Sequence, residues 1–481
     1  MLTPTPLLLQ HTALIKQLLE YVLHLPPPLA APLLRSLLPL QRQRPELRDH
    51  LVMLLRKAMF YKEEELRLTA VHGFLLLLQD TAADAPAGGA AASSSSGSGG
   101  GGAQLQLELL NSIRRSFGQQ PSIRKALYAG LVPAYAGQPA LRELILELLL
   151  GQLRLYHDDA AAGSTQAPEA PLRLSECFHQ GDTLALVEPL PQLLHALVLC
   201  VRHADAHGGG GGGAAAAARE RMGAIAAAVA RCNLTSFGLA EVEGGATQAK
   251  KAGEKLVAKL AAAKLLHSSV AALLEWCVYC EGDGSEQPAA TQAAAPTQGS
   301  AATLAGNQLT HQLFKLLLAI DGLLLEAGAP LAKKAPAHLH EAEFSLSLGC
   351  CEKVLGAVAA TQARLAGSQA HYARFVLKAT AAKAHALAAT LAAERRGAAA
   401  TLVGDAKAEE LQKVGGCARV LVALMAAAEE LDGKEAPSGR RSVNPLTGKK
   451  EKAAATEGGG EKSKAKEKEG KEKEGKEKEK E

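Results

Sequence analysis

Apolar residues recur every three to four positions along most of this chain, which is the spacing of one face of a helix. Such patterns cover 7–23, 29–40, 47–60 and 62–78, and the prolines at 26–28 interrupt the first two. Consecutive helices joined by such short breaks pack as antiparallel neighbours, and each is too apolar to stand alone. The pattern predicts an α-solenoid without a strict repeat.

Helical pattern resumes at Leu105 and continues through most of the remaining chain, interrupted once by a polar loop and an extended piece at 171–177. No useful run of alternating apolar and polar residues occurs, so the predicted fold class is all-α, a solenoid of antiparallel helix pairs. The further predicted helices are three that end near Phe117, Tyr135 and Tyr156, and then 187–207, 214–231, 247–280, 307–327, 341–365, 371–395 and 406–431.

Composition divides the chain into units. The run SSSSGSGGGG and a second stretch rich in Gly, Ala, Thr and Gln cannot bury surface, so both predict flexible linkers. After Ser438 apolar residues are lost and Lys alternates with Glu, which predicts a disordered, solvated tail rather than a DNA-binding arm. The predicted units are 1–80, the linker 81–103, 104–281, the linker 282–305, 306–432 and the tail 433–481.

The overall composition supports helices and gives no sign of a strongly charged partner. A hydrophobic content of 47% in 481 residues is ample for buried cores, and an aromatic content of only 3% favours helices over strands. The net charge is +4, from 53 basic and 49 acidic residues. Any affinity for DNA must therefore come from local basic patches.

The start of the chain and its cysteines both predict an intracellular protein. Polar residues at 10, 11, 16, 17 and 20 interrupt the apolar start, so neither a membrane-spanning helix nor a signal peptide is expected. The cysteines are scattered through helical pattern, which suits a reducing compartment and predicts free thiols. The eight are Cys177, Cys200, Cys232, Cys277, Cys280, Cys350, Cys351 and Cys417.

The motifs that would indicate an enzyme are incomplete. The glycine run 208–213 is followed by no Gly-Lys-Ser/Thr and preceded by no strand, so it does not predict a phosphate loop. Cys277 and Cys280 have the spacing of a zinc or redox half-site, but the second half is missing. The histidine pairs, which also lack completing ligands, are His203 with His207 and His338 with His340. We expect no catalytic residue, metal, cofactor or small-molecule substrate.

Basic side chains gather at one predicted helix junction and on an earlier helix. On a concave solenoid surface such cations could contact DNA phosphates, with binding that falls as salt rises, and nothing indicates readout of base edges. An ordinary solvated face is the alternative reading. The candidate phosphate contacts are Arg56, Lys57, Arg114, Arg115, Arg124 and Lys125.

Three stretches carry a family resemblance, and they occur in family order and spacing. The first, 47–78, contains LRKAMF and AVHGFLLLL; the second, 107–130, contains an Arg-Arg pair, a Gln-Gln pair, a following Arg and Leu-Tyr-x-Gly. The third, 171–194, contains QGD and EPL. Together these stretches resemble the Fanconi anaemia group I protein family.

The resemblance implies both architecture and function. It assigns 1–80 to the end of the family's second solenoid, 104–281 to its second helical domain and 306–432 to part of its third solenoid, so the sequence is expected to be a central fragment. It also implies a nuclear, non-catalytic DNA-repair scaffold. Such proteins pair with a paralogous subunit of the Fanconi complex, clamp duplex or branched DNA at interstrand crosslinks, and are modified by ubiquitin ligase machinery.

The sequence departs from the family pattern at the regulatory site. In the family, the ubiquitin acceptor is a lysine just before an S-A-V-x-G-F motif, whereas here the motif begins at Thr69 and the preceding residue is Leu68, which has no amine. Lys57 and Lys62 are the nearest substitutes, but a shift of several residues moves the amine to another helix face. The Ser-Gln pair at 368–369 is far from this segment, and Gly and Ala replace an acidic run after the third stretch.

Two alternatives to a DNA-repair scaffold stay open. A generic helical-repeat protein that binds other proteins, without a DNA role, would keep the helices and lose the motif order. An enzyme that uses Cys277 and Cys280 is the other possibility, and it would lose activity or metal when both are replaced by Ser.

Overall fold

The computed structural model describes residues 11–80, 100–157, 170–180, 184–206, 213–239, 249–282, 299–326, 336–347 and 350. All of them lie in the first of two units, Met1–Glu429. The second unit, Glu430–Glu481, is outside the described residues, so the predicted tail is too. The predicted helices 371–395 and 406–431, and the larger parts of both predicted linkers, also fall outside them.

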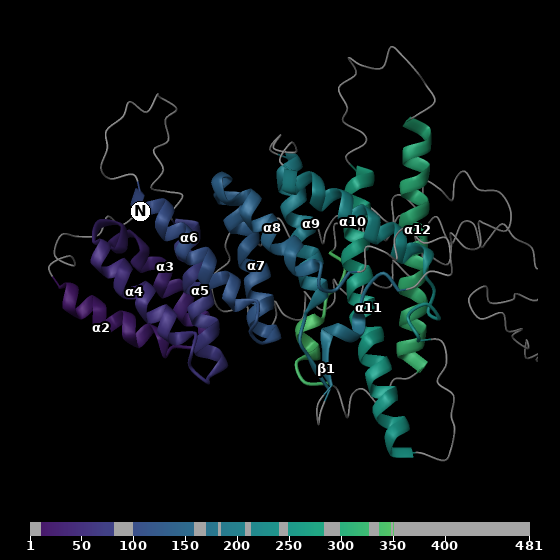
Figure 1. The fold of residues 1–481 in the computed structure, drawn as a ribbon, viewed down its shortest axis with the longest axis horizontal. Coiled ribbons are helices and arrows are strands. Elements are labelled where there is room, and N and C mark those ends of the chain that lie inside the picture. The colour runs from purple at the N-terminus through teal and green to yellow at the C-terminus, as the bar shows by residue number, and fades with distance from the viewer. Residues whose placement is uncertain are drawn as a thin grey trace, which may run out of the picture. The chain divides into compact units, whose positions relative to one another are not determined.

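The described residues confirm the all-α solenoid (Figure 1). Proline occupies the first position of α3, α4 and α7, where its missing N–H costs no hydrogen bond. Helices α6 and α12 begin inside the predicted linkers. The helices are α2 Thr12–Leu23, α3 Pro27–Gln43, α4 Pro45–Ala58, α5 Glu64–Asp80, α6 Gly100–Ser116, α7 Pro121–Gly137, α8 Arg142–Leu153, α9 Leu190–Ala206, α10 Gly213–Arg231, α11 Ala249–Gly282 and α12 Gly299–Glu326.

Many helices pack against the helix two places along the chain, as in a solenoid, while α4 and α6 pack mainly on α5, and α12 on α11. One layer runs through α3, α5, α7, α9 and α11, and the other includes α2 on α4, α8 on α10 and α10 on α12. Helix α5 also contacts α4 and α6, so it has neighbours on several sides. This explains why its apolar run Phe74–Leu78 is buried at every position, since a helix surrounded by others needs no polar face.

Two glycines allow the central helices to approach closely. A Cβ added at Gly73 of α5 would come within 2.6 Å of Leu55 Cδ2 on α4. A Cβ added at Gly130 of α7 would overlap Leu75 Cδ1 on α5. These contacts place the glycines of the first two family-like stretches at the interfaces that join α4, α5 and α7.

A short hairpin adds two three-residue strands to the otherwise helical fold. After the 3-10 turn η2 (Leu174–Cys177), strand β1 (Phe178–Gln180) pairs antiparallel with β2 (Leu184–Leu186). Ala337 extends the pairing, because Leu186 N–H donates to its carbonyl at 3.0 Å. Strands of three residues are too short for an alternating pattern to be visible in sequence.

Residues 336–347 also differ from the predicted helix that starts at 341. They form the 3-10 turn η5 (Leu339–Ala342) and then run extended to Ser347. Backbone N–H groups here donate to side chains of α11: Phe344 to Ser268 Oγ at 3.3 Å and Ser347 to Glu275 Oε1 at 2.6 Å. Since neighbouring helices satisfy its backbone, this segment has no need to form a helix of its own.

One stretch within α11, Lys255–Tyr279, is long and apolar enough to span a membrane by length and composition alone. Its apolar character has another explanation, because 61% of the most apolar window is buried inside the structure. Helices α9, α10 and α12 all pack against α11. A core helix is therefore a sufficient account of this stretch.

Replacing Gly73 or Gly130 by alanine should destabilise the solenoid, because a methyl group would overfill the interface at Leu55 or Leu75. We expect each variant to lose about 1–3 kcal/mol of unfolding free energy in urea denaturation. Gly223→Ala is the matched control, since Gly223 lies within α10 and a Cβ there meets nothing within 4 Å. This control should be neutral or stabilised by up to about 1 kcal/mol. Equal effects at all three glycines would contradict the packing argument.

Candidate functional site

Arg67 of α5 holds together the α4–α5 and α6–α7 turns, and four of the six predicted basic residues lie in the last helical turns that lead into them. Its Nη1 donates to Gln119 Oε1 at 3.0 Å and its Nη2 to Gln120 Oε1 at 2.8 Å, both in the α6–α7 turn. The same Nη2 reaches Lys62 O, at 3.4 Å, in the α4–α5 turn. Ser122 adds a second link, because its hydroxyl donates to the Glu64 carboxylate. The two turns therefore form one edge of the solenoid.

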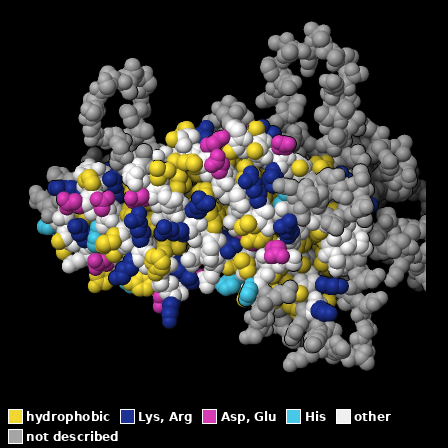
Figure 2. Space-filling model, viewed as in Figure 1, with side chains coloured by type: hydrophobic (Ala, Val, Ile, Leu, Met, Phe, Trp, Pro, Cys, Tyr) yellow, Lys and Arg dark blue, Asp and Glu magenta, His cyan; other side chains and the backbone are white. Residues whose placement is uncertain are grey.

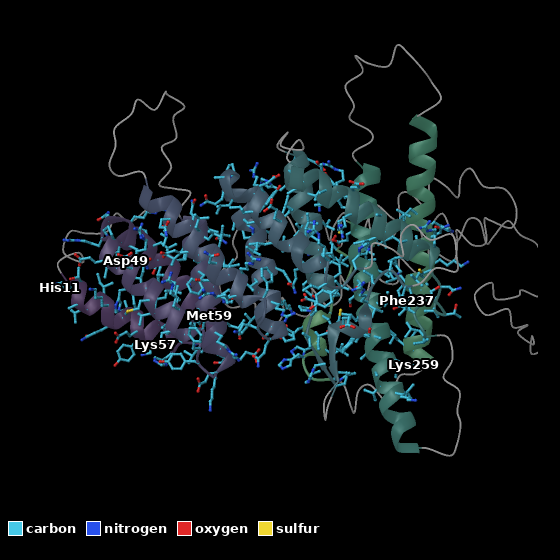
Figure 3. All side chains as sticks on the ribbon, in the orientation of Figure 1. His11, Asp49, Lys57, Met59, Phe237 and Lys259 are labelled. Carbon is cyan, nitrogen blue, oxygen red and sulfur yellow. The ribbon has the colours of Figure 1, made fainter. Side chains whose placement is uncertain are left out.

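Five of the six candidate phosphate contacts reach the surface around this edge. Lys57, labelled in Figure 3, is exposed in the last turn of α4, and Arg114 and Arg115 are exposed in the last turn of α6. Arg56 pairs with Glu108 at 3.0 Å and Lys125 with Glu341 at 3.1 Å. Both pairs are partly solvent-exposed, so each is worth little energetically and does not bury its cation. Figure 2 shows basic side chains interspersed with hydrophobic ones on the face in view.

Arg124 is not a phosphate contact, because it belongs to the core. Its Nη1 lies 2.7 Å from Glu188 Oε2, and the two side chains are only 9% and 0% exposed. Tyr128 Oη donates to the other carboxylate oxygen at 2.6 Å, and Gln152 Nε2 to Oε2 at 2.8 Å. Arg124 Nη1 also approaches Tyr156 Oη at 3.3 Å. Sequence reasoning missed this network, although the i, i+4 spacing of Arg124 and Tyr128 puts both on one helix face.

Burial and the Glu188 carboxylate set the ionisation of this network. Desolvation, followed by the charge of Glu188, raises the pKa of Tyr156 to about 12 and that of Tyr128 well above its ordinary value. The pKa of Arg124 is also raised, because the pairing with Glu188 outweighs the desolvation that opposes it. One cation, one anion and two neutral phenols therefore share the site, and all the charge is internally balanced.

The position of the family's ubiquitin acceptor lies beside the core. Leu68, near the start of α5, is half-buried and packs against the hydrophobic core. Lys57 and Lys62, the substitutes considered above, are both exposed on the two sides of the α4–α5 turn. Their amines are accessible, and the assignment of either as an acceptor stays a prediction.

The cysteines and histidines that were considered as metal ligands or redox groups lie in environments typical of structural residues. Within the described residues no group of three or more His, Cys, Asp or Glu could hold a metal ion. Cys277 is buried, and His203 contacts the Tyr135 ring edge-on at 5.9 Å between centroids. The rings of His338 and His340 stack on each other. The side chain of Cys280 and the whole of residue 207 lie outside the described part. The other described cysteines, also buried, are Cys177, Cys200, Cys232 and Cys350.

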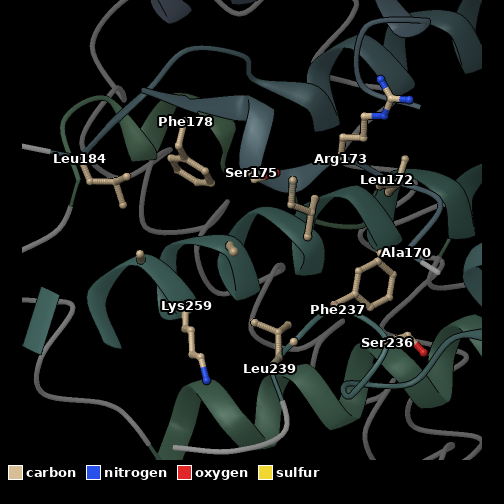
Figure 4. Close-up of a pocket in the computed structure, with 14 residues that line it drawn as sticks. Ala170, Leu172, Arg173, Ser175, Phe178, Leu184, Ser236, Phe237, Leu239 and Lys259 are labelled. Atoms are coloured by element: carbon tan, nitrogen blue, oxygen red, sulfur yellow. The ribbon is translucent and has the colours of Figure 1, made fainter. Parts of the chain in front are cut away.

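A cavity of about 440 Å³ lies between the hairpin region and α11 (Figure 4). Its apolar wall includes Phe178, Phe237 and Leu239, and its charged lining residues are Arg173 and Lys259. The cysteines and carboxylates discussed above do not line it. The cavity therefore offers no convergent set of groups for acid–base or nucleophilic catalysis.

The three family-like stretches contact one another directly. Arg67 of the first binds the Gln-Gln pair of the second, and Gly130 of the second packs on Leu75 of the first. Arg124 of the second pairs with Glu188 of the third. The residues that carry the resemblance are thus the residues that join α5, α7 and the segment before α9.

These features define a helical solenoid scaffold whose core is joined by a buried polar network. Residues 2–75 match the family described as FANCI solenoid 2, and residues 83–291 match FANCI helical domain 2. Together the matches cover more than half of the chain, which belongs to the Fanconi anaemia group I protein family.

Individual relatives agree with this assignment. The chain is 30% identical over 213 residues to the Fanconi anemia group I protein homolog of Mus musculus. It is 31% identical over 212 residues to the Fanconi anemia group I protein of Gallus gallus. Each match covers 41% of this chain and 15% of the relative, so the chain corresponds to a small part of those proteins.

Removing the buried cation should be costly. Arg124→Met leaves the Glu188 carboxylate buried and without its ion pair, so we expect a loss of about 3–5 kcal/mol in unfolding free energy. Arg115→Met is the control, because Arg115 is exposed and its loss should change stability by about 0.5 kcal/mol or less. Urea denaturation followed by circular dichroism measures both. Similar values for the two variants would refute a structural role for the pair.

Stability should also fall at alkaline pH because the folded state holds Tyr156 in its neutral form. The folded pKa, about 12, is raised above the unfolded value, so this contribution is complete below pH 10 and lost as pH rises through 12. Two pKa units correspond to about 3 kcal/mol. The buried thiols of Cys177 and Cys200 titrate in every variant, so the useful measurement is the difference between the unmodified chain and Tyr156→Phe. Tyr156→Phe should lose less stability between pH 10 and 12, and identical pH profiles would argue against the assignment.

Proposed function

We propose that the chain is a non-catalytic DNA-repair scaffold of the Fanconi anaemia pathway that works in the nucleus. In this proposal it pairs with the paralogous subunit of the Fanconi complex and clamps duplex DNA at interstrand crosslinks. The observation that carries the proposal is family membership over the solenoid and helical-domain segments. Two relatives whose names place them in the same group support it.

The physical form of the chain suits a scaffold. Helices stacked along a solenoid present extended edges to partners, and the charges of the core are paired internally, as at Arg124 and Glu188. Within the described residues, the cysteines considered for catalysis are buried, and no group of three or more His, Cys, Asp or Glu could hold a metal ion. This arrangement favours binding as the activity of the chain.

The edge formed by the α4–α5 and α6–α7 turns is our candidate DNA contact. Lys57, Arg114 and Arg115 project from it, and Lys62 is exposed in the same region. Cations of this kind attract phosphates without reading sequence, which fits a protein that must recognise a lesion in any sequence. A helical-repeat scaffold that binds proteins and has no DNA role is the alternative, and it predicts no salt-sensitive DNA affinity.

DNA binding by the purified chain tests the proposal. Fluorescence anisotropy with labelled duplex and forked DNA should show affinity that falls steeply between about 50 and 200 mM salt. Arg115→Ala should reduce the slope of log affinity against log salt by roughly 0.9 for one lost phosphate contact. Lys315→Ala, an exposed cation on α12, is the matched control and should leave the slope unchanged.

Two results would count against this function. Absence of DNA binding by the unmodified chain, together with failure to co-purify with the paralogous subunit, would reject it. Equal salt slopes for Arg115→Ala and Lys315→Ala would show that this edge does not contact DNA. The pathway assignment would be unaffected.

A further inference from the structure

A second cavity, of about 240 Å³, lies between the end of α8 and the first half of α10. Two arginines line it from these two segments: Arg154 directly follows the last residue of α8, and Arg221 lies within α10. His157, which is only 4% exposed, and the exposed Glu220 also belong to the lining. Two guanidinium groups from different segments therefore border the same concave space.

The walls of this cavity are held in place by contacts outside it. Helix α8 packs on α10, and Glu143 Oε1 on α8 accepts the Ala214 N–H of α10 at 2.8 Å. Tyr156, the residue before His157, is bonded through both its backbone and its side chain: its carbonyl accepts the Arg173 N–H at 2.9 Å, and its hydroxyl reaches the network around Glu188. A ligand would therefore meet a surface that needs little ordering.

The acids of the described lining do not balance its positive charge. Arg154 and Arg221 bring two positive charges, and Glu220, the one acid in that lining, brings a single negative charge. By contrast, Arg219, two residues before Arg221, is ion-paired with Asp205 of α9. Within the described residues, Arg154 forms no ion pair. An anion in the cavity would supply the balance that its lining lacks.

A phosphate monoester matches this lining in charge and shape. It carries a charge of about −1.5 to −2 at neutral pH and has three strong acceptor oxygens, whereas each phosphate of a DNA backbone carries one charge. Guanidinium groups bind such oxygens in pairs. We propose that the α8–α10 cavity binds a phosphate monoester group, as free phosphate or on a phosphorylated side chain, and that Arg154 and Arg221 hold it. This site does not depend on the proposed DNA contact, which is built from other helices.

Inorganic phosphate is the first probe. Titrated into the full chain at constant ionic strength, it should raise the melting temperature in a saturable way, because a ligand that binds the folded state stabilises it. Arg154→Gln and Arg221→Gln should each weaken binding by roughly tenfold or more, the size of one lost charged hydrogen bond. Arg231→Gln is the matched control, since Arg231 is an exposed arginine of α10 that does not line the cavity. Absence of saturable binding, or equal effects of all three variants, would overturn the proposal.

Two further variants separate a site in the cavity from general attraction to basic side chains. Glu220→Gln removes a negative charge from the lining and should tighten phosphate binding. Ala224→Leu keeps every charge but places a larger side chain in the lining, so it should weaken binding. Both positions are exposed, so the fold should survive both changes. Unchanged affinity in Ala224→Leu would mean that phosphate binds outside the cavity, and weaker binding in Glu220→Gln would contradict the charge argument.

A labelled peptide with one phosphoserine, compared with its unphosphorylated form, distinguishes the two sources of the group. Tighter binding of the phosphopeptide than of inorganic phosphate would support the site and identify a phosphorylated side chain as its ligand. Binding of inorganic phosphate alone would support the site with the free ion as ligand. In either case Arg154→Gln should weaken the binding.

Two other results would overturn the inference. In the first, Arg154→Gln weakens binding of duplex DNA while phosphate and phosphopeptide fail to bind, so the cavity would belong to a DNA surface. In the second, phosphate binds only after Asp158 and Asp159 are both replaced by Asn. These two acids follow His157 in the sequence and lie outside the described residues, and such a result would show that the chain's own carboxylates satisfy the cavity. Failure of DNA binding by the unmodified chain would reject the proposed function and leave this site unaffected.

Discussion

The buried ion pair between Arg124 and Glu188 is the interaction on which the centre of this molecule depends. Glu188 is fully buried, and a carboxylate there is tolerable only if a cation and further donors reach it together. The donors are Arg124 and Tyr128 of α7 and Gln152 of α8, while the acceptor Glu188 lies in the residues that lead into α9. The network therefore requires three successive parts of the chain to adopt one arrangement before its charges are compensated.

The helices around this network are held together by apolar packing, and two glycines let neighbouring helices approach each other closely. Gly73 and Gly130 let α5 lie against α4 and α7, and the apolar run of α5 fills the space between them. After the 3-10 turn η5, residues 343–347 lie against α9 and α11, with their backbone bonded to side chains of both helices. A segment far along the sequence thus contributes to the core of the helical domain.

The division between interior and edge accounts for the proposed function. Charges inside are paired at short distance, while those on the α4–α5 and α6–α7 edge face solvent or form partly exposed pairs. Arg67 joins the two turns through three hydrogen bonds, so the charged edge moves with the helices rather than as a loose loop. A scaffold that binds a polyanion benefits from this, because a preorganised surface loses less entropy on binding.

The sequence by itself determined most of the helices in the described part of the chain and the family resemblance. Helical periodicity is a local property, and the motifs around Gly73, Tyr128 and Glu188 could be read directly from the chain. The predicted helix boundaries were close to those observed wherever neighbouring helices simply stack. The structure differed from the prediction at the short hairpin, where Leu186 also bonds to the distant Ala337, and in residues 343–347, which donate to side chains of α11.

Only the tertiary structure decided which charged residues are available to a partner. Arg124 and Arg115 look alike in sequence, yet one is buried against Glu188, 64 residues away, and the other is exposed. The exposure of Phe60 could not be predicted from the sequence either, because its motif suggested a position within a helix rather than in a turn. Burial depends on which segments meet in space, and periodicity within one helix carries no information about that meeting.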